Sequence, residues 1–325
     1  MKMQKPADRN FTLTMERGNH LILPTAFHPI NKYNQSHLVF DLYMAVASGS
    51  TQEARNILLS YPHVDFNIPV KGATALSLSL YKRHFDIFNL LMRHYEKSKN
   101  LNLNKSSKDH LNRVEPPIIT ACRMHFLEGV VALVNAGADI DAADNYNHTA
   151  LWVACRQQMP DLVEYLISNG ASVNKTDQFN RTPLLTALTY RVSSFITKTL
   201  IVHGSNLQGP KYPIGGISAQ HNPLFWASKH KAMEIVKLLL CAGIPLWEIR
   251  SVRRALIMDG DNDVAIISLL DAEINNPPSL KQLCRMEIRS CISKNCNGKG
   301  FLKNIETLPL PVILKQYVSL RVLYM

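Results

Sequence analysis

The sequence predicts an all-α fold, in which a solenoid of helix pairs with finger turns is followed by a small helical unit. Three observations lead to this prediction. Two short landmarks recur in phase, about one every 33 residues, over the middle of the chain. The composition is that of a globular protein, with 46% hydrophobic residues in a chain of 325. Amphipathic segments bounded by prolines follow the last landmark.

The first landmark is a helix-start motif that ends in alanine. It reads Thr-Pro-Leu-Leu-Thr-Ala at 182–187, and its counterparts end at Ala121, Ala154 and Ala227, so the steps are 33, 33 and 40 residues. The second landmark is a glycine at positions 137, 170, 204 and 243. We infer that Thr or Asn caps a first helix, that Pro occupies its first turn, and that Gly ends the second helix in a left-handed turn.

The repeat also sets the boundaries of the array. Weaker copies at Phe40–Leu59 and Thr74–Leu91 precede the clear ones, which gives about six helix pairs over residues 38–248. Each pair buries its apolar face on the next, so six are enough for a continuous core. Residues 1–37 are left as an N-terminal extension.

Two insertions and a degenerate end complete the predicted array. The polar stretch Glu96–Asn112 and the Pro- and Gly-containing stretch Gly209–Gln220 lengthen two steps, and we expect both to be exposed loops. Residues 249–276 contain two further helices, around 252–258 and 264–274, which we expect to cap the array.

A different unit occupies residues 277–325, after the helix-breaking pair Pro277-Pro278. Ser279 and Gln282 have the spacing of a capping box and predict a helix that begins at Leu280. One face of this helix is apolar and the charged residues cover most of the rest. The apolar face consists of Leu280, Leu283, Cys284, Ile288 and Cys291, and the charged residues are Lys281, Arg285, Glu287 and Arg289.

A second helix is predicted after Leu308-Pro309-Leu310-Pro311. The prolines are expected to hold this stretch extended, and Pro311 suits the first turn of a helix. The apolar stripe of that helix consists of Ile313, Leu314, Tyr317 and Leu320. The chain between the two helices is interpreted as a linker.

These motifs resemble two known modules. The repeat resembles the ankyrin repeat, best over residues 115–206, and the C-terminal unit resembles a SOCS box. Residues 279–288 are similar to its Elongin C-binding (BC) box and residues 308–317 to its cullin box. In this order the modules resemble the ankyrin repeat and SOCS box family over roughly residues 38–320.

The resemblance implies a non-catalytic substrate-recognition subunit of an Elongin B/C–cullin-5–RING E3 ubiquitin ligase. The partners implied are Elongin C, Elongin B, cullin-5 with its RING subunit, and a protein substrate. The residues implied to bind Elongin C are Leu280, Leu283, Cys284 and Ile288, and those implied to bind the cullin are Leu308, Pro309, Leu310 and Pro311. The Leu-Pro-Leu-Pro form is similar to the cullin-5 type. The alternative is an ankyrin scaffold whose C-terminal helices recruit no ligase.

The exposed turns between successive helix pairs are called fingers. Substrate contacts are expected on these fingers and on the first helices of the pairs. The candidates are Asn145, Tyr146, His148, Arg156, Gln178, Phe179, Arg181 and Arg191. Tyr146 and Phe179 occupy equivalent finger tips, and aromatic anchors supply much of the energy of protein interfaces. The alternative for each candidate is a solvated surface residue. Trp152 and Trp226 lie within helix-start motifs and are interpreted as packing residues.

Composition argues against several other functions. The formal charge is +11, but the basic residues are scattered, so we expect no nucleic-acid partner. No apolar stretch is long enough for a membrane span or a leader, and the six cysteines are expected to be reduced thiols in the cytoplasm and also the nucleus. The spacing of cysteines and histidines indicates no metal site, and no phosphate-binding motif indicates a cofactor.

Overall fold

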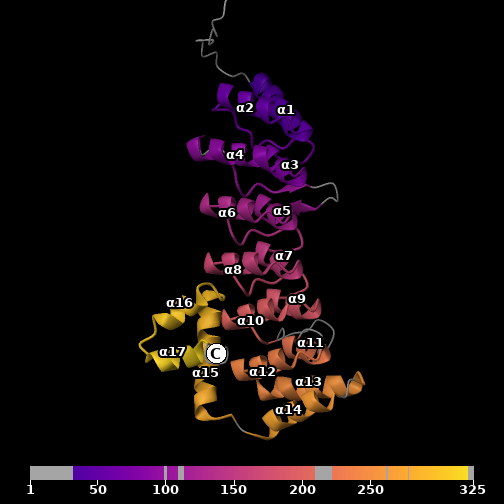
Figure 1. Ribbon diagram of the computed structural model, residues 1–325, viewed down its shortest axis with the longest axis vertical. Coiled ribbons are helices and arrows are strands. Elements are labelled where there is room, and N and C mark those ends of the chain that lie inside the picture. Colours follow the sequence, from indigo (N-terminus) through magenta and orange to yellow (C-terminus); the bar gives the residue numbers. More distant parts are fainter. Residues whose placement is uncertain are drawn as a thin grey trace, which may run out of the picture.

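The computed structural model describes residues 32–98, 101–108, 113–208, 222–260, 263–276 and 278–320. In this part of the chain, seventeen helices and two short strands form an elongated stack of helix pairs with a smaller helical unit at its side (Figure 1). The predicted fold class is confirmed. The insertion expected at 209–220, most of the N-terminal extension and the last five residues of the chain lie outside the described residues.

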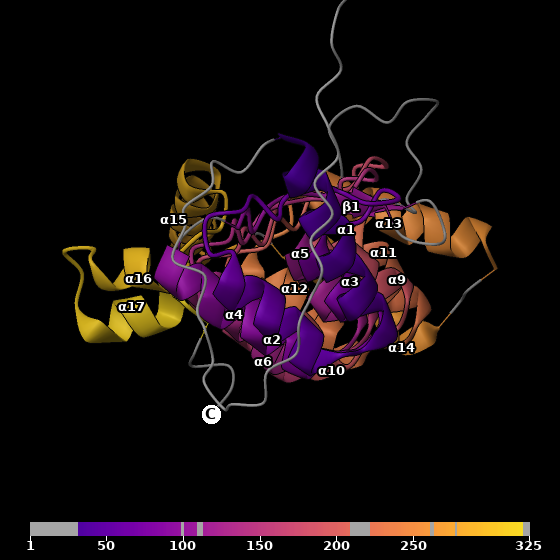
Figure 2. The ribbon, with the colours of Figure 1, turned by 90° about the horizontal axis from the view of Figure 1, so that it is seen from above.

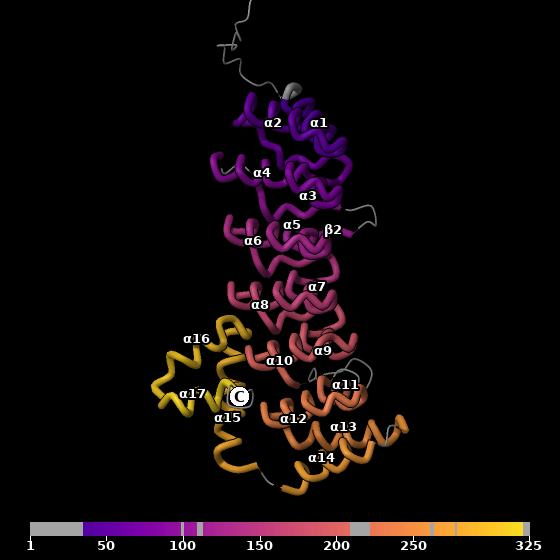
Figure 3. The backbone as a smooth tube through the Cα atoms, in the orientation of Figure 1, coloured from indigo at the N-terminus to yellow at the C-terminus, as the bar shows by residue number. Residues whose placement is uncertain are grey.

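The stack begins with six helix pairs, whose regular spacing is clearest along the backbone tube in Figure 3. The first helices of the pairs are α1 (Lys32–Ser48), α3 (Ala75–Tyr81), α5 (Pro117–Arg123), α7 (Ala150–Arg156), α9 (Pro183–Thr189) and α11 (Pro223–Lys229). The second helices are α2 (Thr51–Ser60), α4 (Phe85–Ser98), α6 (Leu127–Asn135), α8 (Pro160–Ser168), α10 (Ser194–Val202) and α12 (Met233–Ala242). Helix α1 therefore begins within the stretch that the sequence left as an extension.

Helix ends follow the predicted chemistry. The side chains of Thr74, Thr149 and Thr182 accept hydrogen bonds from backbone N–H groups in the first turns of α3, α7 and α9. Pro183 and Pro223 are the first residues of α9 and α11, where their missing N–H costs nothing. The four repeat glycines that follow the second helices have positive φ, between 82° at Gly204 and 110° at Gly243.

The core runs through the stack between first and second helices. The repeat alanines Ala121, Ala154, Ala187 and Ala227 have no exposed surface, which agrees with close packing of the first helices on both neighbours. Trp152 is also buried, as expected for a packing residue, whereas Trp226 is only half-buried.

The described part of the insertion at 96–112 is not the exposed loop that its polarity predicts. Leu101 and Leu103 are buried in the core, and β1 (Ser107–Lys108) pairs antiparallel with β2 (Val114–Glu115). The Ser107 hydroxyl also accepts a hydrogen bond from the backbone of Thr74. Alternation of leucine and asparagine puts the leucines on one side of an extended chain, and this period-two pattern outweighs the average polarity of the segment.

A seventh helix pair ends the stack. Helix α13 (Leu246–Met258) packs on α11, and α14 (Val264–Asn275) packs on α13. The first of these helices begins earlier than the sequence pattern suggests, because Pro245 takes the N-cap position. Glu248 in its first turn is buried and accepts a hydrogen bond from the Asn222 amide, so this pair is joined to the repeat before it.

The C-terminal unit lies beside the last repeats. It consists of α15 (Leu280–Cys296), α16 (Phe301–Glu306) and α17 (Val312–Val318). The capping box of Ser279 and Gln282 is confirmed. Helix α15 contacts α12, and the view along the stack shows the unit at one side of it (Figure 2). Helix α16 occupies what the sequence suggested was a linker, and its Phe301 and Ile305 form a small core with Val318.

We predict that Leu103→Ala lowers the free energy of unfolding of the chain by about 2–4 kcal/mol, because a buried leucine is lost from the array. The matched control is Leu59→Ala on α2, where the side chain is 71% exposed and a change below about 0.5 kcal/mol is expected. Urea unfolding followed by circular dichroism measures both. Equal stability of the two variants would contradict the folded insertion.

Candidate functional site

The outward face of α15 is apolar and uncovered. Leu280 has 78% of its surface exposed and Leu283 has 43%, and the Cys284 thiol is exposed one helical turn after Leu280. Side chains three and four residues apart lie next to one another on a helix, so these three form one patch. Three of the four residues expected to bind Elongin C are therefore accessible together.

Ile288 does not belong to this patch. It is half-buried and packs against the small core of Phe301, Ile305 and Val318. The expectation that it shares the exposed face with Leu280 is wrong for the chain in this structure. The reason is α16, a helix that the sequence pattern did not reveal and that covers this part of α15.

The opposite face of α15 carries buried arginines. Arg285 and Arg289 are each only 5% exposed, although the sequence pattern placed them on the solvated surface. The guanidinium of Arg285 lies 4.4 Å from the centre of the Tyr317 ring, and the Lys281 ammonium lies 4.3 Å from the same ring. These cation–π contacts hold α17 against α15.

Arg289 joins the C-terminal unit to the array. Its Nη1 donates a hydrogen bond of 2.9 Å to the carbonyl of Val318, and its Nη2 donates one of 2.6 Å to the carbonyl of Ile201 at the end of α10. The guanidinium also lies 4.8 Å from the centre of the Phe301 ring. One buried cation thus contacts α17, α16 and the fifth helix pair.

Further contacts lie along the same side of α15. The Ser293 hydroxyl donates to the carbonyl of Gly204 over 2.6 Å and accepts from the Asn174 amide. At the end of the helix, the Asn297 amide donates to the Ser172 hydroxyl, which in turn donates to the Asn297 carbonyl. The turn after α15 is therefore fixed to the array by hydrogen bonds.

Gly204 is required by this junction as well as by its own turn. Its φ of 82° favours glycine, and a Cβ atom there would lie 2.3 Å from the Phe301 ring. The glycines at the same repeat position in the third and fourth pairs, Gly137 and Gly170, have nothing within 4 Å of such an atom. Gly204 therefore both ends a repeat turn and forms part of the surface on which α16 packs.

The Leu-Pro-Leu-Pro stretch is a bend. The Leu310 N–H donates a hydrogen bond of 2.8 Å to the carbonyl of Leu308, so the chain turns tightly at Pro309 instead of running extended as expected. Pro309 and Pro311 are exposed, and Leu308 and Leu310 are partly exposed. Pro311 is the N-cap of α17, one position before the expected one.

Helix α17 presents part of its predicted apolar stripe to solvent. Ile313 is 74% exposed and Leu314 is 40% exposed, whereas Leu320 is buried against the core of the array. The stripe is therefore not one face. Its first residues are exposed, and Leu320, which follows the end of α17, is buried.

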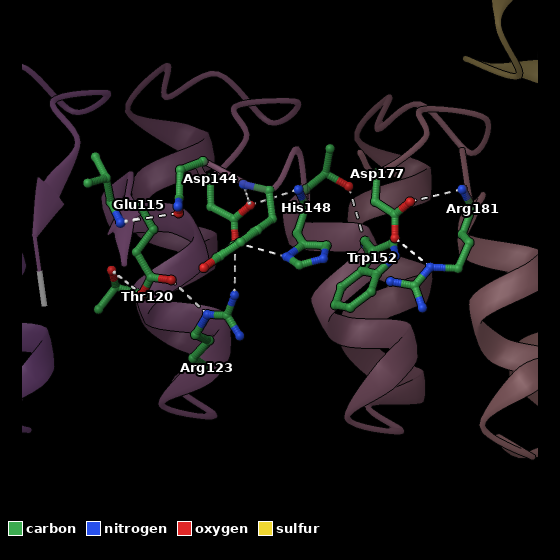
Figure 4. A network of polar contacts seen from close by, with 12 residues as sticks. Glu115, Thr120, Arg123, Asp144, His148, Trp152, Asp177 and Arg181 are labelled. Atoms are coloured by element: carbon green, nitrogen blue, oxygen red, sulfur yellow. Dashed lines mark hydrogen bonds and ion pairs between the residues drawn. The ribbon is translucent and has the colours of Figure 1, made fainter. Parts of the chain in front are cut away.

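The fingers of the array are cross-linked by buried carboxylates (Figure 4). Asp144 accepts hydrogen bonds from the Arg123 guanidinium, the His148 ring and the backbone of Tyr146. Burial alone would raise the pKa of Asp144, but the hydrogen bonds from His148 and Tyr146 outweigh burial and lower the pKa. Its charged form therefore stabilises the fold at neutral pH, and this contribution is lost as the pH falls through the lowered pKa.

The next finger repeats this arrangement. Asp177 accepts from the backbone of Phe179 and Arg181 and from the Arg181 Nε at 2.7 Å. Neighbouring fingers are also linked, because the backbone N–H of Asn145 donates to Val114 and that of Gln178 donates to Tyr146. The backbones of Asn145 and Gln178 thus hold the fingers in register, and their side chains remain exposed.

The other candidate substrate residues surround Trp152. The His148 ring stacks on it with centroids 3.7 Å apart, and the guanidinium carbons of Arg156 and Arg181 lie 5.6 and 5.9 Å from its ring centre. Tyr146 and Phe179 are exposed at the finger tips. Sequence reasoning missed Tyr190, which is exposed and lies 4.7 Å from the Arg156 guanidinium, because it follows a helix end and not a finger.

Thiol and metal chemistry receive little support in the described ranges. Cys122 and Cys155 are free and fully buried, and burial raises the pKa of both thiols. Within those ranges no cluster of three or more His, Cys, Asp or Glu side chains could hold a metal ion. The same part of the chain contains no helix that is long and apolar enough to span a bilayer.

Two family models match the chain. The model described as SOCS box matches residues 276–319, and the model described as ankyrin repeats (3 copies) matches residues 99–177 and 157–248. No curated protein matches the chain. Together the two modules indicate an adaptor or receptor subunit instead of a catalytic domain, and the SOCS box indicates binding of Elongin B/C and a cullin.

We predict that Arg289→Ala releases the C-terminal unit from the array. The change removes two charged hydrogen bonds and leaves the carbonyls of Ile201 and Val318 unpaired, a loss of about 3 kcal/mol or more. Hydrogen exchange should become faster in residues 278–320 while α1 to α9 keep their protection. The control, Lys294→Ala on the exposed surface of the same helix, should leave exchange unchanged. Unchanged protection in the Arg289 variant would contradict the anchoring role.

Proposed function

The chain belongs to the proteins that join ankyrin repeats to a C-terminal SOCS box, and on this premise we propose that it is the substrate-recognition subunit of an Elongin B/C–cullin-5–RING E3 ubiquitin ligase. In this proposal the array holds a protein target and the SOCS box recruits the ligase. The observation that carries the proposal is the uncovered patch of Leu280, Leu283 and Cys284 on a helix whose other side is pinned to the array.

The exposure of this patch also separates the proposal from a simple scaffold. A helix that only capped the array would place its largest apolar side chains against the repeats. Helix α15 instead buries Arg289 against them and leaves Leu280 in solvent. Exposed leucines on a fixed helix are the arrangement that a partner pocket requires, because little conformational entropy is lost on docking.

The proposed mechanism needs no nucleophile in this chain. The ubiquitin thioester is carried by another enzyme, which the RING subunit brings through the cullin. The receptor contributes effective concentration, since it holds a lysine of the target near the charged enzyme. The fixed junction at Arg289 supports this role because it keeps the target surface and the ligase end in one rigid body.

We propose cullin-5 as the cullin because the bend has the sequence Leu-Pro-Leu-Pro. Pro309 and the apolar side chains of Ile313 and Leu314 are exposed and available to a partner. We also propose that the protein acts in the cytoplasm and the nucleus. The free thiols of all six cysteines are compatible with a reducing compartment.

We predict that Leu280→Ala together with Cys284→Ala abolishes binding of Elongin B/C without unfolding the array, because both side chains are exposed and make no contribution to its core. Co-purification after coexpression measures binding, and circular dichroism measures folding. Glu287→Ala, on the same helix, serves as the control and should bind normally. Retention of Elongin C by the folded double variant would refute the proposed receptor.

We predict that replacing Pro309, Leu310 and Pro311 together by alanine removes cullin-5 and leaves Elongin B/C bound. The change deletes the exposed bend, whereas the patch on α15 is some 25 residues upstream and unaltered. The variant should bind its target yet fail to support its ubiquitination. Immunoprecipitation beside the wild type decides the matter: undiminished cullin-5, or cullin-2 in the wild-type sample, would mean that the box is of another type.

A further inference from the structure

A cluster of aromatic rings and arginines spans two neighbouring repeats and includes several of the candidate substrate residues. We call it the aromatic–arginine cluster and define it as Tyr146, Trp152, Arg156, Phe179, Arg181 and Tyr190. The Arg156 guanidinium lies over the rings of Trp152 and Tyr190, and the Arg181 guanidinium lies over those of Trp152 and Phe179. Tyr146 joins them through His148, whose ring stacks on Trp152. The rings of Tyr146, Phe179 and Tyr190 are 40–57% exposed.

The charges in this cluster are not balanced. Arg181 is paired with Asp177, and Asp144 is occupied by Arg123 and His148, so the buried carboxylates of the fingers are already used. Arg156 is exposed and has no carboxylate partner among the described residues. A cation held between two aromatic rings and facing solvent is available for a ligand.

Arg191 adds a second available cation at the next repeat. It is exposed, also has no carboxylate partner in the described ranges, and follows Tyr190 directly. Burial and the charge of Arg191 lower the pKa of His230, the residue that follows α11. Arg156 and Arg191 thus supply one exposed cation in each of two neighbouring repeats.

From this arrangement we propose that the cluster receives an extended acidic segment of the protein target, which places carboxylates on Arg156 and Arg191 and a large apolar side chain among Tyr146, Phe179 and Tyr190. The proposal rests on the proposed function in that the array is the part of the ligase that holds the target. It adds the chemistry of the segment recognised.

Geometry constrains the pattern of this segment. Neighbouring repeats are about 10 Å apart, as packed helices are. An extended chain rises about 3.3 Å per residue, so about three of its residues span that distance. The segment is therefore expected to repeat an acidic residue about every three positions, with one or more aromatic or large aliphatic residues between.

A nucleic acid fits this surface less well than an acidic peptide. Binding to phosphates at physiological salt relies on many cations, on the order of 6–10 contacts, whereas this surface offers only Arg156 of the cluster and the neighbouring Arg191. Residues 38–276 carry 23 Lys and Arg against 21 Asp and Glu, a formal net charge of only +2. The positive charge is local, which suits a short acidic segment.

The test uses the full chain in complex with Elongin B and C, and a random 12-residue peptide library displayed on phage as the probe. Selected peptides should be enriched in Asp and Glu around an aromatic or large aliphatic residue. A synthetic copy of the strongest binder is then compared with its Asn/Gln counterpart by fluorescence anisotropy, and the counterpart should bind at least about tenfold more weakly.

The variant Arg156→Gln with Arg191→Gln should weaken the acidic peptide by about tenfold or more. Arg191 has a φ of 51°, and Gln158 already adopts a φ of 58° at the equivalent turn, so glutamine is tolerated there. The matched control is Arg55→Gln with Arg93→Gln, which removes two exposed arginines from second helices and should change nothing. Thermal unfolding of both variants should coincide with that of the wild type.

Three outcomes would overturn the proposal: selection of basic or neutral peptides, equal binding of the acidic peptide by both double variants, or preferential binding of an oligouridine probe that the Arg156 and Arg191 changes abolish. Elongin C is followed in the same samples. Its retention with loss of the acidic preference refutes only the proposed chemistry of the target, whereas its absence from the wild-type sample contradicts the ligase role.

Discussion

The junction between the array and the C-terminal helices depends on one buried cation, Arg289. Its guanidinium is shielded from water, so its cost of burial must be offset by the carbonyls of Ile201 and Val318 and by the Phe301 ring. These partners come from three separate elements, and each is held in place because it contacts the same group. The small core of α16 and α17 would be too small to stay folded on its own without such support.

This constraint explains why the exposed surfaces of the molecule can carry function. With one side of α15 fixed, its other side can remain apolar and uncovered without collapsing onto the array. The fingers are also held from their buried side. Asp144 and Asp177 accept hydrogen bonds from the finger backbone, and the aromatic rings at the finger tips stay exposed. In both places hydrogen bonds of buried charged groups stabilise a surface that has few stabilising contacts of its own.

The sequence predicted the regular parts well, for reasons that are local. Caps such as Thr182, turn glycines such as Gly170 and the capping box at Ser279 act within a few residues, so their pattern is visible in the sequence. The buried role of Arg289 was not predictable, because an arginine at helical spacing is ordinarily solvated and its partner Ile201 is 88 positions away. The short α16 lacked a repeat or a period to reveal it, and with it the inward turn of Ile288 was missed.

The path of α15 has a consequence for how the array can change length. The helix returns along the stack, and it meets the turns of the sixth, fifth and fourth pairs at Gly243, Gly204 and Ser172 in that order. Its 17 residues extend about 25 Å, which matches two to three repeat spacings of about 10 Å. If a whole repeat were added or lost among these three pairs, α15 could no longer make all three contacts. Beyond α15, Lys299 also pairs with Asp141 in the turn after the third pair. Repeats before the third pair share none of these contacts, so reach toward a target can grow at the N-terminal end while the geometry of the ligase end stays constant.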